Sequence, residues 1–315
     1  MYLPNRFSIN VLTVQVSPSK IHRGSRYPIS MAESVAIVTD SISCLTKELI
    51  DCYRIGIVPI RLLVQGKVYR DLVDITPSEA YEFFLQNPES FNTSPSSPGH
   101  YLEAFREANN RARSILCITL SSKLSTGYDM ARAAREQAKA ELPATRIEVL
   151  DSQNVTAAEG FIVLAAARAA AIAPDLDAVL KVAEAVRDKV TFIILLDTIR
   201  HVYRTGRIPK VASRIGSILN IKPILTSSSG LVRLKGVVKN RERGISRLLE
   251  IMREKVGQNP VHVAVMHAYV PEEAEALKKR IASEFNCAEL WVTEFSPVMG
   301  YATGTGTLGF AFYQD

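Results

Sequence analysis

Residues 115–127 read ILCITLSSKLSTG, and the fold prediction depends on the pattern in this stretch. Residues 115–120 are an apolar and partly β-branched run, which is typical of a strand buried on both faces. Polar residues follow at once, and helical spacing begins near Tyr128. A buried strand, a short polar loop and a helix form the repeating unit of a parallel α/β sheet. Because ligands bind at the carboxyl ends of such strands, this loop is also a candidate binding segment.

The same alternation recurs on both sides of this stretch. Further strands are predicted at residues 35–40, 57–64 and 146–150. One helix is predicted to start at Pro77, where Thr76 and Glu79 form a capping box, and another at Pro98. Strands that alternate with helices in this way predict parallel pairing with right-handed crossovers.

The second half of the chain has a different pattern. Strands are predicted at residues 190–196, 221–226, 231–238, 261–268 and 289–293, with a hairpin turn across residues 228–230. We therefore predict the α/β class with two domains. Residues 34–190 form an N-terminal parallel α/β domain, and residues 191–315 form a C-terminal α+β domain with a mixed or antiparallel sheet.

Composition excludes several classes of protein. The 315 residues are 47% hydrophobic and 22% charged, which is ordinary for a globular chain. The longest apolar stretch, residues 161–173, contains Arg168 and is too short to cross a bilayer, so no stable membrane insertion is expected. The four cysteines form no CxxC pair and no metal-ligand spacing with the five histidines. We expect no metal, and free cysteines in a chain of this size indicate a reducing, cytoplasmic location.

The net charge of +6 is concentrated at the N-terminus. The first 30 residues contain Arg6, Lys20, Arg23 and Arg26 and no acid, which leaves only +2 for the rest of the chain. A body with so little excess charge disfavours a nucleic-acid partner. We interpret residues 1–33 as a disordered, dispensable leader or an over-long start with translation beginning at Met31, and a targeting sequence is the alternative.

Three polar segments carry the candidate chemistry: residues 93–99, 121–127 and 301–307. Each is rich in serine, threonine and glycine. A loop that leads from a strand into a helix presents hydroxyls and unpaired backbone N–H groups, which suit a small anionic head group. Taken alone, each segment is explained more simply by local turns and caps.

Catalytic machinery is not apparent. The Gly304-Thr305-Gly306 sequence lacks the third glycine of a dinucleotide fingerprint, and neither a phosphate-binding GxxxxGK[ST] loop nor a GxSxG elbow occurs. Asp40 and Asp71 follow different strands, and nothing in the sequence brings them together. We therefore predict a protein that is not an enzyme. The alternative is a phosphotransferase-like enzyme acting on a small hydroxylated ligand, which the many hydroxyls suggest.

Short motifs in order between residues 35 and 312 resemble the bacterial DegV family of fatty-acid-binding proteins. These motifs are Val38-Thr39-Asp40-Ser41, Tyr69-Arg70-Asp71, Thr93-Ser94, Ser97-Pro98-Gly99, Leu120-Ser121-Ser122-Lys123-Leu124-Ser125, Asp151-Ser152, Thr205-Gly206-Arg207-Ile208, Ile221-Lys222-Pro223 and the segment from Thr303 to Gly309. The resemblance implies one bound long-chain fatty acid, such as hexadecanoate, and no other cofactor. It places the tail in an internal tunnel and the carboxylate near the interface of the two domains.

The resemblance also implies roles for individual residues. The two head-group hydroxyls fall on Thr93 and Ser125, and Ser94, Thr126 and Thr303 complete the predicted ligand site. In some bacteria, family members present the bound acid to a separate fatty acid kinase, which makes acyl phosphate for phospholipid synthesis.

The resemblance further concerns three positions that are relevant to coupling with this kinase. Arg207 and Arg241 match arginines implicated in the partnership, although Arg207 also fits a solvated helix face. The chain has Ala302 where the family usually has a histidine that reaches the head group. We expect fatty-acid binding to tolerate this loss better than kinase coupling does.

Overall fold

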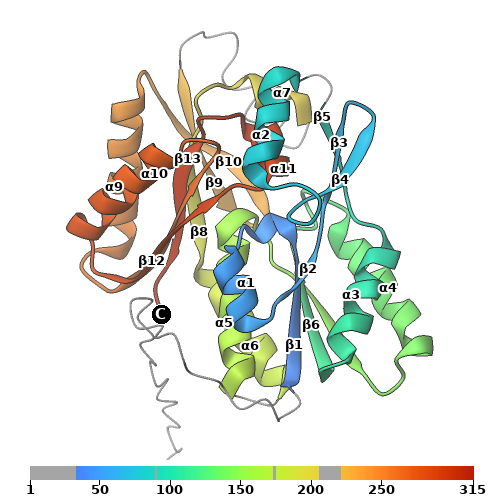
Figure 1. Cartoon of the computed structure of the whole chain (residues 1–315). Coiled ribbons are helices and arrows are strands. Elements are labelled where there is room, and N and C mark those ends of the chain that lie inside the picture. Colours follow the sequence, from blue (N-terminus) through green and yellow to red (C-terminus); the bar gives the residue numbers. More distant parts are fainter. Residues whose placement is uncertain (1–32, 89–90, 173–174, 206–220) are drawn as a thin grey trace, which may run out of the picture. The chain divides into compact units, whose positions relative to one another are not determined.

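The computed structural model describes residues 33–88, 91–172, 175–205 and 221–315 (Figure 1). These residues form three β-sheets with helices packed on their faces, so the predicted α/β class is confirmed. Residues 1–32 of the predicted leader and Arg207 lie outside the described residues, whereas Glu33, predicted to end the leader, begins the first strand.

The first sheet is four-stranded and entirely parallel, as predicted. Its order is β2-β1-β6-β7, and its strands are β1 (Glu33–Asp40), β2 (Gly56–Val58), β6 (Ala112–Thr119) and β7 (Arg146–Asp151). Helices α3 (Pro98–Asn109) and α4 (Gly127–Glu141) cover one face. Helices α5 (Thr156–Ile172) and α6 (Leu176–Lys189) cover the other, while the 3-10 turn η2 (Ser41–Ser43) and α1 (Lys47–Tyr53) follow β1.

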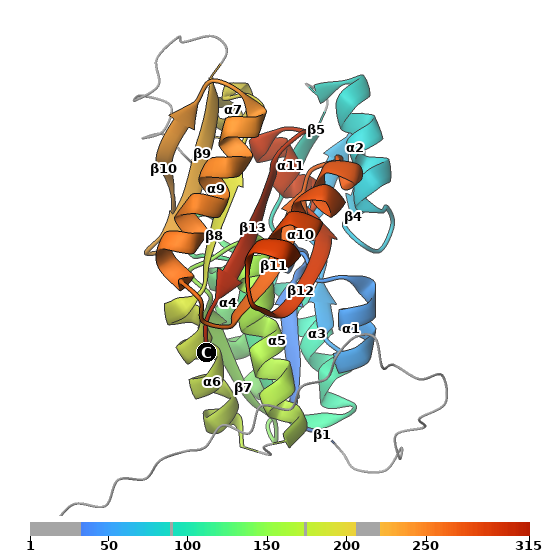
Figure 2. The same ribbon diagram turned by 90° about the vertical axis from the view of Figure 1, so that its left-hand side faces the viewer.

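The second sheet is six-stranded and mixed, as predicted for the C-terminal half. Its order is β10-β9-β8-β13-β11-β12, with strands β8 (Thr191–Leu195), β9 (Lys222–Ser228), β10 (Leu231–Val238), β11 (Val261–His267), β12 (Cys287–Glu294) and β13 (Leu308–Tyr313). Only β11 and β12 pair in parallel. Helices α9 (Arg241–Val256) and α10 (Pro271–Glu284) lie on its outer face (Figure 2). The predicted hairpin joins β9 to β10, and both turn residues, Ser229 and Gly230, have positive φ.

A small third sheet differs from the sequence prediction. It has the antiparallel order β4-β3-β5, with β3 (Arg61–Val64), β4 (Lys67–Arg70) and β5 (Phe91–Ser94), and α2 (Pro77–Gln86) packs on it. The single strand predicted at residues 57–64 is therefore wrong. It divides at Pro59 into β2 and β3, because proline has no N–H with which to continue a ladder. Thr93 and Ser94, predicted in a loop, end strand β5.

Helix α5 lies between the two large sheets. It contacts β1 and β6 of the parallel sheet and β8 and β13 of the mixed sheet (Figure 1). This position explains the apolar residues 161–167, which are all buried, since a helix segment enclosed between two sheets needs no polar face. Among the described helices, none is long and apolar enough to cross a membrane.

The predicted boundary at residue 190 falls between the strands of the two large sheets. The parallel sheet ends with Asp151 and the mixed sheet begins with Thr191. Two short helices complete the described chain: α7 (Arg200–Thr205) and α11 (Pro297–Thr303), of which α11 packs against α2 and β5. The boundary itself stays a prediction.

Candidate functional site

A cavity of about 760 Å³, including its opening, lies between the carboxyl ends of the parallel strands and the mixed sheet. Thirteen of its seventeen lining residues are apolar: Ile42, Ile60, Pro95, Leu120, Leu124, Val155, Phe192, Ile194, Leu225, Val232, Val298, Met299 and Ala302. The site is therefore suited to a ligand that is mostly hydrocarbon.

The polar part of the wall consists of four hydroxyls from three separate segments. Thr93 and Ser94 come from the end of β5, Ser125 from the loop between β6 and α4, and Thr303 from the end of α11. The structure thus brings together four of the five predicted ligand residues. Thr126 is exposed beside the first residue of α4 and is not among the lining residues. The ligand-binding roles of all five stay predictions.

The four hydroxyls differ in whether they already donate a hydrogen bond within the protein. Ser94 Oγ donates to the carbonyl of Pro95 at 3.4 Å, and Thr303 Oγ1 donates to the carbonyl of Met299 at 2.9 Å. Ser125 Oγ instead accepts from the backbone N–H of Gly127 at 3.3 Å. The hydroxyls of Thr93 and Ser125 donate to no described residue. These two hydroxyls are therefore the ones able to donate to a ligand.

The cavity wall carries no charge. None of its described lining residues is an acid, lysine, arginine, histidine or cysteine, and Ala302 offers no donor. Among the described residues, no group of three histidine, cysteine, aspartate or glutamate side chains is arranged to hold a metal ion. Hydroxyls are the only polar side-chain groups that the described lining residues present to an anionic head group.

Two fully buried aspartates lie directly behind the wall. The two Asp40 carboxylate oxygens accept from the backbone N–H groups of Ile42 at 3.0 Å and Leu120 at 2.9 Å, and both residues line the cavity. Burial raises the pKa of Asp40 to about 7, and these two hydrogen bonds oppose the shift.

Asp71 holds a different part of the wall. Its Oδ2 accepts from the hydroxyl of Ser296 at 2.6 Å, and Ser296 caps α11, the helix that contributes Thr303. Burial raises the pKa of Asp71 to about 6. Its charge also raises the pKa of Asp40, so the fold brings close two carboxyl groups that the sequence left apart. The sequence signals for Asp40 are its place at the end of a β-branched run and within the motif Val38-Thr39-Asp40-Ser41, and neither indicates that it lies near Asp71.

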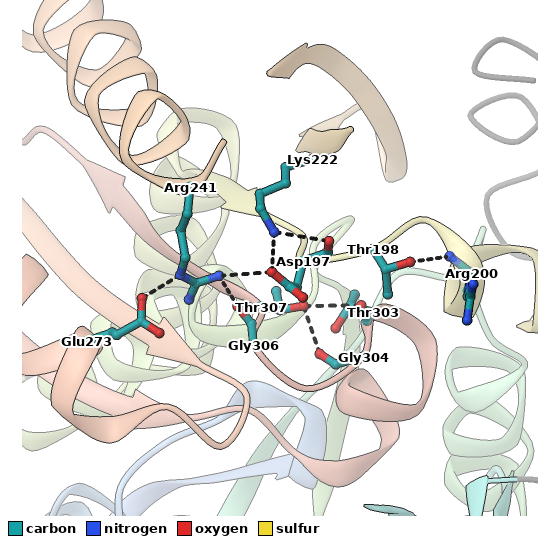
Figure 3. A network of polar contacts seen from close by, with 10 residues as sticks. All are labelled: Asp197, Thr198, Arg200, Lys222, Arg241, Glu273, Thr303, Gly304, Gly306 and Thr307. Atoms are coloured by element: carbon teal, nitrogen blue, oxygen red, sulfur yellow. Dashed lines mark hydrogen bonds and ion pairs between the residues drawn. The ribbon is translucent and has the colours of Figure 1, made fainter. Parts of the chain in front are cut away.

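Arg241, the predicted partner-binding arginine, begins α9 and belongs to a polar network inside the chain (Figure 3). Its Nε pairs with Glu273, and its Nη1 donates to the carbonyl of Gly306 at 2.8 Å. Asp197 lies between Arg241 and Lys222 and pairs with both. The guanidinium is thus already engaged with the loop that follows α11, and its partner role stays a prediction.

Comparison with known proteins gives a consistent result. The family model DegV, described as "Uncharacterised protein, DegV family", matches residues 34–315. A DegV domain-containing protein of Caldanaerobacter subterraneus is 29% identical over 284 residues, which cover 90% of this chain and 99% of that protein.

Solved structures agree in fold and in the ligand they are named for. A fatty-acid-binding DegV family protein from Thermus thermophilus is 28% identical, with a TM-score of 0.82, over 89% of this chain and 99% of its own. DegV from Bacillus subtilis, described as a fatty acid binding protein, is 26% identical, with a TM-score of 0.81 over the same shares.

Proposed function

Because the chain belongs to the DegV family, we propose that it binds one long-chain fatty acid, such as hexadecanoate, in the cavity between its two large sheets. The hydroxyls of Thr93 and Ser125 hold the carboxyl group, and the apolar wall holds the tail. One observation carries the proposal. The two predicted head-group residues, which are far apart in the sequence, line the same apolar cavity and keep their protons free for a ligand.

The tail and the head group are expected to contribute different amounts of binding free energy. Burying one methylene contributes about 0.8 kcal/mol, so a tail of about 14 methylenes supplies up to roughly 11 kcal/mol before ordering costs. A hydrogen bond to a charged group contributes only about 1.5–3 kcal/mol net. The tail therefore provides most of the affinity, and the hydroxyls select a carboxyl head group and fix its orientation.

The cavity favours a carrier over an enzyme. Its described lining residues include no acid, general base or thiol, so a bound molecule meets only hydroxyls and hydrocarbon. We expect this carrier to act in the cytoplasm and to present its fatty acid to a separate kinase for acyl-phosphate formation. Arg241, near the loop that follows α11, and Arg207 are the residues proposed to contact that kinase. Formation of acyl phosphate by a purified kinase with the loaded protein tests this step.

Extraction of the purified protein tests the binding proposal directly. Organic extraction followed by mass spectrometry should yield a long-chain fatty acid in near-stoichiometric amount. If the protein is instead purified without ligand, added hexadecanoate should bind and raise its melting temperature, because a ligand of the native state stabilises it. A protein that carries no acyl chain and binds no added hexadecanoate would disprove the proposal.

A further inference from the structure

Asp40 connects two parts of the cavity wall that come from different strands. It is the last residue of β1, its side chain is fully buried, and it lies at the carboxyl edge of the parallel sheet. One carboxylate oxygen accepts from Ile42, just after β1, and the other accepts from Leu120, just after β6. Because the Ile42 and Leu120 backbone groups are both N–H donors, residue 40 needs a side chain with two acceptor oxygens to bind both of them. Asparagine has the same shape but would turn an NH₂ group toward one of these donors.

The bond to Leu120 sets where the Ser125 loop begins. The next residue, Ser121, donates its backbone N–H to the carbonyl of Asn154 at 2.9 Å. The Ser121 carbonyl then accepts from the N–H groups of Leu124 at 3.0 Å and Ser125 at 3.2 Å. This tight turn has little freedom between its first and last residues. A shift at Leu120 is therefore passed on to the hydroxyl of Ser125.

We propose that Asp40 is a positioning residue for the head group, which acts through Leu120 on the hydroxyl of Ser125. This inference rests on the proposed function. Asp40 does not line the cavity, and its effect on the ligand passes through the loop. Thr93 provides a contrast. It lines the same cavity but belongs to β5, which pairs with β3 in a different sheet, and the Asp40 side chain makes no hydrogen bond to the described residues of that sheet.

A double-mutant cycle tests the coupling. Ser125→Ala in the wild-type background should weaken hexadecanoate binding about tenfold, the loss expected for one hydrogen bond to a charged group. In the Asp40→Asn background the same substitution should change affinity by less than about twofold, because the hydroxyl is already displaced. Thr93→Ala should weaken hexadecanoate binding by the same factor in the wild-type and Asp40→Asn backgrounds.

Two controls separate positioning from general damage. Asp175→Asn removes an aspartate that likewise accepts two backbone N–H groups, at the start of α6, and should leave binding unchanged. Hexadecanol, which fills the cavity without a carboxylate, should bind Asp40→Asn about as well as it binds the wild type. Equal costs of Ser125→Ala in both backgrounds, or an equal loss of hexadecanol affinity, would overturn the inference. Failure of the wild type to bind hexadecanoate would instead overturn the proposed function.

A pH series answers the same question if Asp40→Asn does not fold. Ionised Asp40 accepts both N–H groups, whereas protonated Asp40 turns an O–H toward one of them. The affinity ratio of wild type to Ser125→Ala should therefore rise between pH 6 and 8, around the Asp40 pKa of about 7. The other titratable groups facing Asp40 are Cys44, Asp71, Tyr101, Cys117 and Glu159. A ratio that is constant over this range would overturn the inference.

Discussion

The two sides of the cavity are built from different kinds of structure. The mixed sheet contributes Phe192, Ile194, Leu225 and Val232, all apolar and all within strands. The hydroxyls come from a strand end, a loop and a short helix. The tail side, which is the side proposed to hold the tail, is thus part of a regular hydrogen-bonded ladder. The head-group side, proposed to hold the carboxyl group, is assembled from segments that meet only in the folded chain.

Because of this difference, we expect the sheet side to provide most of the affinity and the hydroxyl side to set the orientation of the ligand. A sheet wall presents a continuous apolar surface with fixed spacing, which suits a hydrocarbon tail that makes no directional contacts. Hydroxyls at strand and helix ends can be aimed individually, which suits a carboxyl group with specific hydrogen-bond directions. Damage to the sheet side should therefore cost more affinity than damage to the head-group side.

The largest effect is expected on the sheet side. Val232→Asp places a charge in the wall that the tail must cover, and burial of an unpaired charge costs several kcal/mol, so affinity for hexadecanoate should fall by at least about 100-fold. Val237→Asp is the matched control, because Val237 lies on the same strand but is 48% exposed. Isothermal titration of both variants measures the difference. Equal affinities would show that the tail does not lie against β10.

The next effect compares hydroxyls within the head-group side. Thr93→Ala combined with Ser125→Ala should weaken binding by about 100-fold without abolishing it, since two hydrogen bonds to a charged group are lost and each contributes about tenfold. Ser94→Ala combined with Thr303→Ala should have a much smaller effect, because both of these protons are already donated to backbone carbonyls. Affinities measured in one titration series decide between the pairs. The reverse order would show that the carboxyl group lies at Ser94 and Thr303.

Much of the fold could be predicted from the sequence because its signals are local. The apolar run at residues 115–120 and the capping box at Thr76 each fix an element without reference to the rest of the chain. The break at Pro59 was missed because residues 57–64 are apolar except for Arg61 and have the pattern of a single strand. Only the sheet topology shows that this run contributes strands to two sheets.

The site could be predicted less fully, for a physical reason. Family motifs indicated Thr93 and Ser125, but which hydroxyls keep their protons depends on carbonyls such as those of Pro95 and Met299, whose directions exist only in three dimensions. The convergence of Asp40 and Asp71 behind the wall likewise requires the folded chain, because the two residues follow strands of different sheets.

The smallest effect is a gain, expected at Ala302, where the sequence resemblance implies a histidine. Ala302 lines the cavity on α11, one residue before Thr303, and the wall has no charged donor. Ala302→His should strengthen hexadecanoate binding roughly fivefold at pH 6, less than a full charge-assisted hydrogen bond because the ring also displaces cavity volume. The gain should shrink by pH 8, since a histidine with a pKa near 6.5 loses its charge over that range.

Ala302→Leu is the matched control for this gain, because it adds volume without a donor and should weaken binding at both pH values by filling space meant for the ligand. The difference between the two variants at pH 6 isolates the contribution of the imidazole. If Ala302→His binds no better than Ala302→Leu at pH 6, the head group does not lie beside α11. The carboxyl group would then lie nearer β5 and the Ser125 loop, where a donor at residue 302 would not reach it.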